Sequence, residues 1–472
     1  MKKTVFLTLV VSILWVGVST PARGQYVNYA SAYIGSKTTD YHSLIRTIDD
    51  TSALVYYFDR GANKGVIARM GLTLSCRKAF LPAGYTLNDM RISGNDVYFC
   101  GSDGANPIMG HVLLSDFSGS TRTLTFYKAN RTYVTSLNRM VAYSDGSGGQ
   151  KVVMVGDLVF TTHPTFPCTT LMSYYDPELG YNVSFYIHYC RRTIIIEADF
   201  NGSMRMTDIC VVTGDTAHHE VISEVLETQN YVAFVGHYTN HHTTIVHKCS
   251  KNSVVADFTN PSHLHYCYYG ILEGHSNFHG CVMNGDTIAV SSLSTYYDGL
   301  GVEHFSTNIR GFDLASMVNT FAQRVPLNTK SEPCDLMYMK KNHCLVLLQD
   351  INLPSLSSDQ NTFVHLAPYN YAPTYYAKCW YESSWQKPFN SLSNVNDTVY
   401  VSSGGEYWCM KDVDQLTPNT CYDVDAIEIT TIAKEIPARE HDPYNKYPRV
   451  LDSLFAYPSS DNEPIIPSCI IP

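Results

Sequence analysis

A pattern of strand, tight turn, strand, loop and strand recurs along this chain, and it limits the possible folds more than any other feature. The clearest copy runs over 90–92, continues through Ser93-Gly94-Asn95-Asp96 to the strand 97–101, and ends with 108–114. Asn, Asp and Gly favour the turn because a tight hairpin needs positive φ angles or side-chain hydrogen bonds to the backbone. The apolar second strand is typical of a strand buried on both faces.

The pattern occurs seven times. Its second strand begins in successive copies at Ala53, Val97, Val152, Tyr231, Thr287, Cys344 and Thr398. The intervals are 44, 55, 79, 56, 57 and 54 residues, and all but the third have the size of one propeller blade. The long interval contains further strand patterns over 186–189, 193–199 and 209–213, which indicate either an insertion or an eighth blade.

Small repeated sheets cannot cover their own faces, so neighbouring copies must stack. Closure into a ring achieves this and leaves only short edges. In architecture the chain therefore resembles the β-propeller superfold over 26–430, without the WD pair, kelch double glycine or Asp box of a particular family. The resemblance implies an all-β propeller of about seven four-stranded antiparallel blades. Two or three antiparallel sandwiches would show the same pattern.

The two ends of the chain differ from the repeats. Lys2 and Lys3 precede an apolar run of 14 residues and the triplet Ala22-Arg23-Gly24, which predicts a signal peptide over 1–24. No later apolar run reaches 18 residues, so we expect no transmembrane segment. The propeller would span 25–430 and be secreted, periplasmic or held at the cell surface. Seven Pro between 437 and 472 predict an extended Pro-rich C-terminal tail over 431–472, lying on the surface or serving for docking.

Fourteen Cys in an exported chain make disulfides plausible, with buried free thiols as the alternative. Local hairpin geometry suggests three pairs: Cys334 with Cys344, Cys267 with Cys281, and Cys168 with Cys190.

Composition restricts the partners. The chain has 33 Lys and Arg against 43 Asp and Glu, and no basic stripe that could neutralise a phosphate backbone, so we expect no nucleic-acid binding. Glycine-rich phosphate loops and a Gly-x-Ser-x-Gly motif are also missing. We therefore expect a monomer without a cofactor, whose partner is a protein or a glycan.

Alternate connections of an antiparallel blade emerge at opposite ends, so the longer loops after the second strands share one face. Binding residues concentrate on loops, which favours this long-loop face as the site. The predicted ligand-binding residues there are Asp59, Arg60, Asp103, His163, His237, His241, Tyr296, Asp298, His304, Asp350 and Glu406.

Histidine is concentrated between His218 and His279. Within this segment His263, His265 and Cys267 alternate, so in a strand they would share one face, as metal ligands could. A Cys in an exported chain is more typical of a disulfide, so no metal is favoured.

These observations favour a secreted, non-enzymatic propeller that binds a protein or glycan through its long-loop face. The alternative is a secreted hydrolase or lyase that uses carboxylates and His on the propeller axis, with catalytic residues that the sequence does not identify. A pocket on the axis with converging acidic and His side chains would favour the enzyme, whereas a flat face would favour binding.

Overall fold

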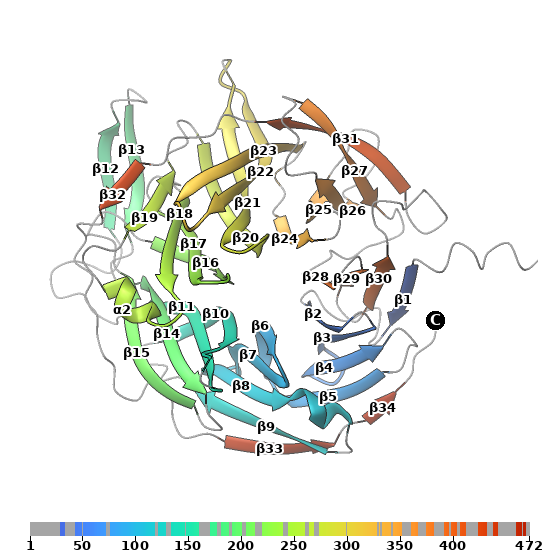
Figure 1. Cartoon of the computed structure of the whole chain (residues 1–472). Coiled ribbons are helices and arrows are strands. Elements are labelled where there is room, and N and C mark those ends of the chain that lie inside the picture. Colours follow the sequence, from blue (N-terminus) through green and yellow to red (C-terminus); the bar gives the residue numbers. More distant parts are fainter. Residues whose placement is uncertain are drawn as a thin grey trace, which may run out of the picture.

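The computed structural model shows antiparallel sheets arranged in a ring, each with one strand at the central axis and one at the periphery (Figure 1). It describes residues 29–33, 43–49, 51–71, 76–118, 121–128, 134–146, 148–159, 170–176, 181–187, 191–200, 204–212, 220–238, 244–259, 264–268, 273–298, 300–327, 330, 333–340, 343–351, 360–366, 374–381, 391–395, 398–403, 406–411, 423–431, 438–441, 459–464 and 466–468. The predicted signal peptide, 1–24, lies outside these residues.

In six parts of the ring, four strands are arranged in chain order from the axis outward, and in the third of these β12 and β13 intervene in the sequence (Figure 1). The first three sets are β2 (Ser43–Asp49), β3 (Ser52–Asp59), β4 (Lys64–Gly71) and β5 (Cys76–Ala83); β6 (Thr86–Ser93), β7 (Asp96–Ser102), β8 (Pro107–Leu113) and β9 (Thr121–Lys128); and β10 (Val134–Ser144), β11 (Gln150–Val159), β14 (Arg191–Phe200) and β15 (Met204–Val212).

The following three sets continue round the ring. They are β16 (Glu220–Glu227), β17 (Tyr231–Tyr238), β18 (Thr244–Ser250) and β19 (Leu264–Tyr268); β20 (Glu273–Val282), β21 (Thr287–Tyr297), β22 (Glu303–Asp313) and β23 (Val318–Leu327); and β24 (Pro333–Met339), β25 (Cys344–Ile351), β26 (Gln360–Leu366) and β27 (Thr374–Tyr381).

One further sheet contains strands from both ends of the chain. Its order is β28 (Ser391–Val395), β29 (Thr398–Ser403), β30 (Glu406–Lys411) and β1 (Tyr29–Tyr33), so an N-terminal strand forms its outer edge. The described residues also contain the 3-10 helix η2 (Leu114–Ser118) and the helix α2 (Val254–Thr259).

The structure confirms the all-β fold and the propeller-like ring. Each of the seven residues predicted to begin a second strand lies in the second strand of a sheet: β3, β7, β11, β17, β21, β25 and β29. The turn 93–96 also has the predicted chemistry, because Gly94 has a φ of 62°. In the long interval, β12 (Thr170–Asp176) and β13 (Tyr181–Ile187) form a hairpin between the second and third strands of one sheet, which indicates an insertion.

Apolar side chains from neighbouring sheets form the core between them. In one cluster Tyr98 and Met109 of one sheet meet Leu137, Met154 and Ile196 of the next, all of them buried. The same sharing of clusters between adjacent sheets recurs elsewhere in the ring. The stacking that the repeat requires is therefore present, and it holds the inner strands around a common axis.

Short strands near the C-terminus pair with outer strands of several sheets. β32 (Ala438–His441) pairs with β19, β33 (Ser459–Pro464) with β9, and β34 (Ile466–Ser468) with β5. Before them, β31 (Asp423–Thr431) lies between β23 and β27 and joins two sheets into one of nine strands. These four strands, here called the outer belt, lie at the rim of the ring (Figure 1). Edge positions suit a Pro-rich segment, because Pro cannot donate to a ladder.

Candidate functional site

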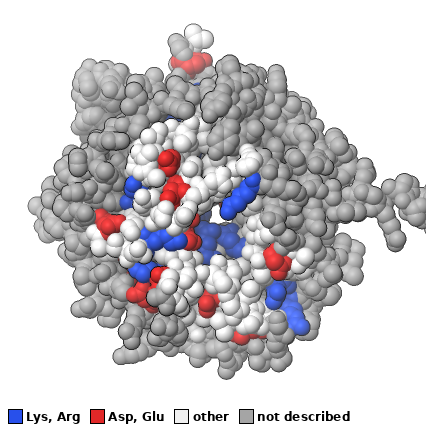
Figure 2. Space-filling view, in the orientation of Figure 1, with Lys and Arg blue, Asp and Glu red and all other residues white. Residues whose placement is uncertain are grey.

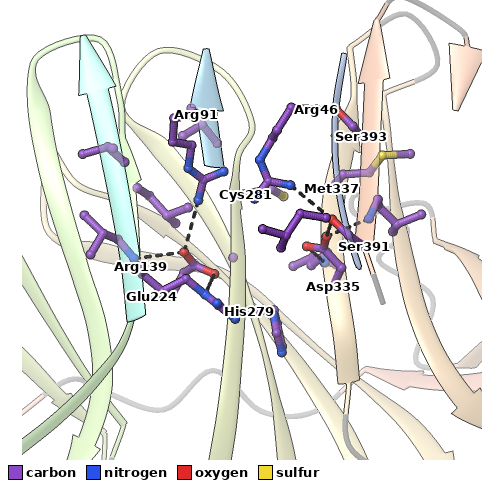
Figure 3. A pocket seen from close by; sticks show the side chains of 18 of the residues that line it. Arg46, Arg91, Arg139, Glu224, His279, Cys281, Asp335, Met337, Ser391 and Ser393 are labelled. Carbon is purple, nitrogen blue, oxygen red and sulfur yellow. Dashed lines mark hydrogen bonds and ion pairs between the residues drawn. The ribbon is translucent and has the colours of Figure 1, made fainter. Parts of the chain in front are cut away.

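A cavity of about 330 Å³ lies where the inner strands meet. Strands β2, β6, β10, β16, β20, β24 and β28 all contribute to its lining (Figure 3). Figure 2 shows basic and acidic side chains gathered at the centre of the ring. The polar side chains that line the cavity are Arg46, Arg91, Arg139, Glu224, Glu227, His279, Asp335, Ser391, Ser393 and Asn394, together with the thiols of Cys281 and Cys334.

β-Bulges in the inner strands place charged residues around this axis. The register shifts immediately before Asp89, Arg139, Glu224 and Asp335. In three sheets the residue opposite the bulge is a glycine of the second strand, and the pairs are Leu87 with Gly101, Leu137 with Gly156, and Ile222 with Gly236. A Cβ atom on each of these glycines would lie 1.9 Å from a carbonyl oxygen of the inner strand. Glycine is therefore needed for the close approach that accommodates the bulge.

Asp89 is a buried carboxylate that joins two neighbouring sheets. It accepts hydrogen bonds from Arg46 Nη2 at 2.7 Å and from the backbone N–H groups of Met90 at 2.8 Å and Met140 at 3.0 Å. Arg91 Nη2 lies 3.1 Å from its other oxygen. Burial raises the pKa of Asp89, but the charges of Arg91 and Arg46 outweigh it, so the pKa lies below its ordinary value. Asp89 is therefore ionised and structural.

Asp335 has the same role between β24 and β28. Its carboxylate accepts hydrogen bonds from the backbone N–H groups of Leu336 at 2.9 Å and Leu392 at 2.7 Å, and from Ser391 Oγ at 3.2 Å. Ser391 in turn accepts a hydrogen bond from Arg46 Nη1 at 3.1 Å. These contacts use most of the acceptor capacity of Asp335.

Glu224 differs from these two carboxylates because its ion pairs are long. Its oxygens lie 3.8 Å from Arg91 Nη2 and 3.7 Å from Arg139 Nε, beyond hydrogen-bond distance (Figure 3). Val225 N donates to it at 3.0 Å. Burial, with only 6% of the side chain exposed, raises the pKa of Glu224 to about 7, although Arg139 and Arg91 oppose this. The carboxyl can therefore gain or lose a proton near neutral pH.

His279 on the neighbouring inner strand β20 also lines the cavity. Burial, and after it the charge of Arg139, lower the pKa of His279 to about 4, against the opposing charge of Asp335. The imidazole is therefore neutral at neutral pH. The cavity thus contains a carboxyl that holds a proton near pH 7 and a neutral imidazole that can accept one.

Each of two guanidinium groups keeps a donor that the described residues leave unused. Arg91 donates through Nε to the carbonyl of Met140 at 2.7 Å, and Arg139 donates through Nη1 to the carbonyls of Asn88 and Asn138 at 3.2 Å. Within the described residues, Arg91 Nη1 and Arg139 Nη2 have no hydrogen-bond partner. Each side chain is 26% exposed, so these N–H groups are accessible from the cavity.

Stability should depend on pH through Glu224 and His279 with opposite signs. The pKa of Glu224 is raised from 4.5 to about 7, so its contribution is full below pH 4.5 and is lost as the pH rises through 7. The pKa of His279 is lowered from 6.5 to about 4, so its contribution is full above pH 6.5 and is lost as the pH falls through 4. In wild type the two trends oppose each other between these limits.

Single substitutions separate the two trends. Urea unfolding measures this. Between about pH 5 and about pH 7 the free energy of unfolding of Glu224→Gln should change by roughly 2 kcal/mol more, in the direction of higher stability, than that of wild type. His279→Asn should change the slope in the opposite sense. Parallel profiles for wild type and Glu224→Gln would show that Glu224 titrates in its ordinary range.

Two predicted disulfides are wrong, Cys334 with Cys344 and Cys267 with Cys281, because neither Cys334 nor Cys281 forms a disulfide. The thiol of Cys281 is free, and burial raises its pKa well above the ordinary value. The pairing with Cys267 is wrong because Cys267 lies on β19, the fourth strand of its sheet, whereas Cys281 lies on the inner strand β20 of the next. The thiol of Cys100 is also free and buried. The bridge between Cys168 and Cys190 falls outside the described residues.

Three of the predicted ligand-binding residues come together in the hairpin β21–β22. His304 Nε2 lies 3.0 Å from Asp298 Oδ2, and its ring stacks on Tyr296 with centroids 5.3 Å apart. Arg324 covers the Tyr296 ring at 4.2 Å. The hydrogen bond with His304 is the main reason that the pKa of Asp298 lies below its ordinary value. Hydrogen bonds from backbone N–H groups of its own turn lower this pKa as well. The cluster stabilises the hairpin, and ligand binding there stays a prediction.

Other predicted residues lie in separate sheets. Asp59 ends β3 and Arg60 lies in the exposed turn that follows. Asp103 accepts hydrogen bonds from the N–H groups of Ala105 and Asn106 and pairs with Lys128 at 2.8 Å. Burial raises the pKa of Asp103, but these hydrogen bonds outweigh it and lower the pKa to about 2. His237 lies in β17 and stacks on Phe278.

For the remaining predicted residues the structure gives only backbone positions or nothing. Asp350 lies in β25, Glu406 begins β30, and His265 and Cys267 lie in β19. His163, His241 and His263 fall outside the described residues. Among the residues that the structure describes, no group of three or more His, Cys, Asp or Glu side chains is arranged to hold a metal ion.

The cavity lies on the axis, between the two faces of the ring. Its lining residues in β6, β16 and β20 occupy the ends of these strands that lead into the tight turns, whereas those in β24 and β28 include residues near the starts of the strands. Asp59 ends the second strand β3 and Asp298 follows the second strand β21, so both lie at the long-loop ends of their sheets and neither lines the cavity. The residues of the cavity were missed because each one resembles an ordinary polar position of a half-buried strand. The glycine that ends the apolar second strand, as in 97–101 and 152–156, was the available signal.

The fold and the cavity thus define a propeller-like ring with a charged axial site. No family model and no curated protein matches the sequence. The chain is similar to the crystal structure of the polysaccharide lyase Uly1. The match covers 84% of this chain and 91% of the lyase chain, with 7% sequence identity and a TM-score of 0.41. The β-propeller domain of the Trilobed protease from Pyrococcus furiosus, with an open velcro topology, matches over 71% of this chain and 100% of its own, with 10% identity and a TM-score of 0.30. With identities of this size, neither structure indicates what this chain binds or does.

None of the helices within the described part of the chain has the length and apolar character that crossing a bilayer requires.

Proposed function

We propose that this protein is an exported, seven-bladed propeller that binds an acidic glycan in its axial cavity. The observation that carries the proposal is the pair of accessible guanidinium groups, Arg91 and Arg139, whose outer N–H groups have no partner within the described residues. The predicted function of glycan binding is kept, but its place is moved from the long-loop face to the axis.

The balance of donors and acceptors supports an acidic ligand. Asp89 and Asp335 are already occupied by backbone and side-chain donors, so few acceptors remain free. A ligand that brings acceptor oxygens would complete the hydrogen bonding of the two arginines. Hydrogen bonds from a guanidinium to a charged carboxylate or sulfate are stronger than those to a neutral hydroxyl, which makes the acidic groups the better partners.

The size of the cavity supports a small ligand. At about 330 Å³ it is at the lower end of the range for small-molecule sites, enough for one or two sugar rings. A folded protein domain is far larger than a cavity of this volume. A terminal acidic sugar of a longer chain could enter while the rest stays outside.

Calorimetric titration tests this proposal with galacturonate against galactose. Galacturonate should bind and galactose should bind at least about tenfold more weakly, because it lacks the carboxylate. Arg139→Met keeps much of the apolar stem and should weaken galacturonate binding by about 10- to 100-fold, the worth of a charged hydrogen bond.

Arg60→Met is the matched control, since Arg60 lies in an exposed turn of the long-loop face. It should bind galacturonate as wild type does. If Arg60→Met loses binding while Arg139→Met keeps it, the site lies on the long-loop face and the axial assignment is wrong.

A second candidate, a hydrolase or lyase, is favoured by one observation. Glu224, with its pKa at about 7, and the neutral His279 line the same cavity, which is the pairing of a proton donor with a proton acceptor. Incubation with polygalacturonate would show new reducing ends for a hydrolase, or new ultraviolet absorbance from an unsaturated product for a lyase. Wild type should then be active, and Glu224→Gln and His279→Asn inactive.

A further inference from the structure

Glu224 lies beside the two arginines that an acidic ligand would use. Its carboxylate lies between Arg91 and Arg139, 3.8 and 3.7 Å from their nitrogens (Figure 3). Arg91 lies on β6 and Arg139 on β10, and both donate hydrogen bonds to backbone carbonyls. These hydrogen bonds hold both guanidinium groups beside Glu224.

The other charged and titratable groups around Glu224 are held more firmly. Asp89 on β6 is ionised and bonded to Arg46 and Arg91, and Glu227 on β16 itself is paired with Lys251. From β20, His279 is neutral at neutral pH and the Cys281 thiol stays protonated. Asp335 is held by the N–H groups of β24 and β28. Glu224 is thus the group here whose charge changes near neutral pH.

We propose that Glu224 competes with the acidic group of the ligand for Arg91 and Arg139, so that the ligand binds together with a proton. The proposal rests on the proposed function, because it requires an acidic ligand in this cavity. When Glu224 is charged, it neutralises the two guanidinium groups and repels the incoming anion. When it is protonated, both arginines are available and the repulsion is removed.

Linkage sets the size of the effect. Where free Glu224 is charged and the complex holds it protonated, binding takes up one proton, and the Kd rises tenfold for each pH unit. Where Glu224 is already protonated, the Kd is independent of pH. The change between the two regimes falls near pH 7, the pKa of the free protein.

Titration of galacturonate into wild type at about pH 6 and about pH 8 tests the proposal. The Kd should rise by about tenfold between the two values, and titrations in buffers of different ionisation enthalpy should show uptake of about one proton at pH 8. This second measurement needs no variant. Free galacturonate is fully ionised at both values, so its own carboxyl does not contribute.

Two variants sharpen the test. Glu224→Gln should bind galacturonate with a Kd that is the same at both pH values, whereas Glu303→Gln, at an exposed carboxylate outside the cavity, should keep the wild-type dependence. Binding to wild type that is independent of pH, without proton uptake, would overturn the competition while leaving the proposed function intact. No binding of galacturonate at either pH to wild type or to Glu224→Gln would overturn the proposed function, and the competition with it.

Discussion

Replacing Asp89 by Asn should destabilise the folded protein by about 3–5 kcal/mol, the usual result of removing one partner from a buried ion pair. The Asp89 side chain is 1% exposed and accepts hydrogen bonds from both β6 and β10, besides its contacts with Arg46 and Arg91. An amide keeps the shape but presents an N–H pair to groups that are themselves donors. Two guanidinium charges are then left without their shared counter-charge.

Urea or thermal unfolding of the purified protein measures this effect. Glu303→Gln is the control, because Glu303 is exposed at the start of β22 and should change stability by less than about 0.5 kcal/mol. A loss at Asp89→Asn as small as that of the control would mean that the carboxylate is not needed to hold β6 against β10.

The second large effect is expected for Gly101→Ala, with a loss of about 3 kcal/mol or more. The new Cβ would lie 1.9 Å from the carbonyl oxygen of Thr86 and 2.8 Å from the Cα of Leu87, so backbone atoms would have to move. Side-chain rotation cannot relieve this contact. The bulge before Asp89 would open, and the ion pairs of Asp89 would be disturbed together with it.

Gly61→Ala is the matched control for this substitution. Gly61 lies in an exposed turn, and the nearest atom to its new Cβ would be the end of the Asp59 side chain at 3.3 Å. The control should unfold within about 0.5 kcal/mol of wild type. If Gly101→Ala does the same, the bulge is deformable and the glycine is not required.

The ring of sheets could be predicted because the information for it is local. Each tight turn has its own chemistry, as at Gly94, and each second strand is apolar along its length, as in 97–101. Repetition then requires stacking, which leads to the architecture without knowledge of any contact between sheets.

The axial cavity could not be predicted in this way because its residues meet only when the ring is closed. Arg91, Arg139 and Glu224 are separated by 48 and 85 positions in the chain. Each one follows the polar alternation of a half-buried strand and carries no motif. The bulges, which direct these side chains, depend on a glycine in the partner strand, so the signal is spread over two strands.

The C-terminal tail was predicted to lie extended on the surface, and its division from the propeller at 431 stays a prediction. What the sequence could not indicate is that β32, β33 and β34 would pair with β19, β9 and β5. Such pairing depends on free edges elsewhere in the fold, which a local reading of Pro-rich residues does not contain.

The sheet that combines β1 with β28, β29 and β30 has a consequence for biosynthesis. Its strands are separated by more than 350 residues of chain, so the ribosome must reach residue 411 before the circle can be sealed. Until then β1 has no neighbour from its own sheet, and β2 faces an open seam. Closure of the ring is therefore a long-range step that comes late in synthesis, and β31, β32, β33 and β34 are made after the strands that close it.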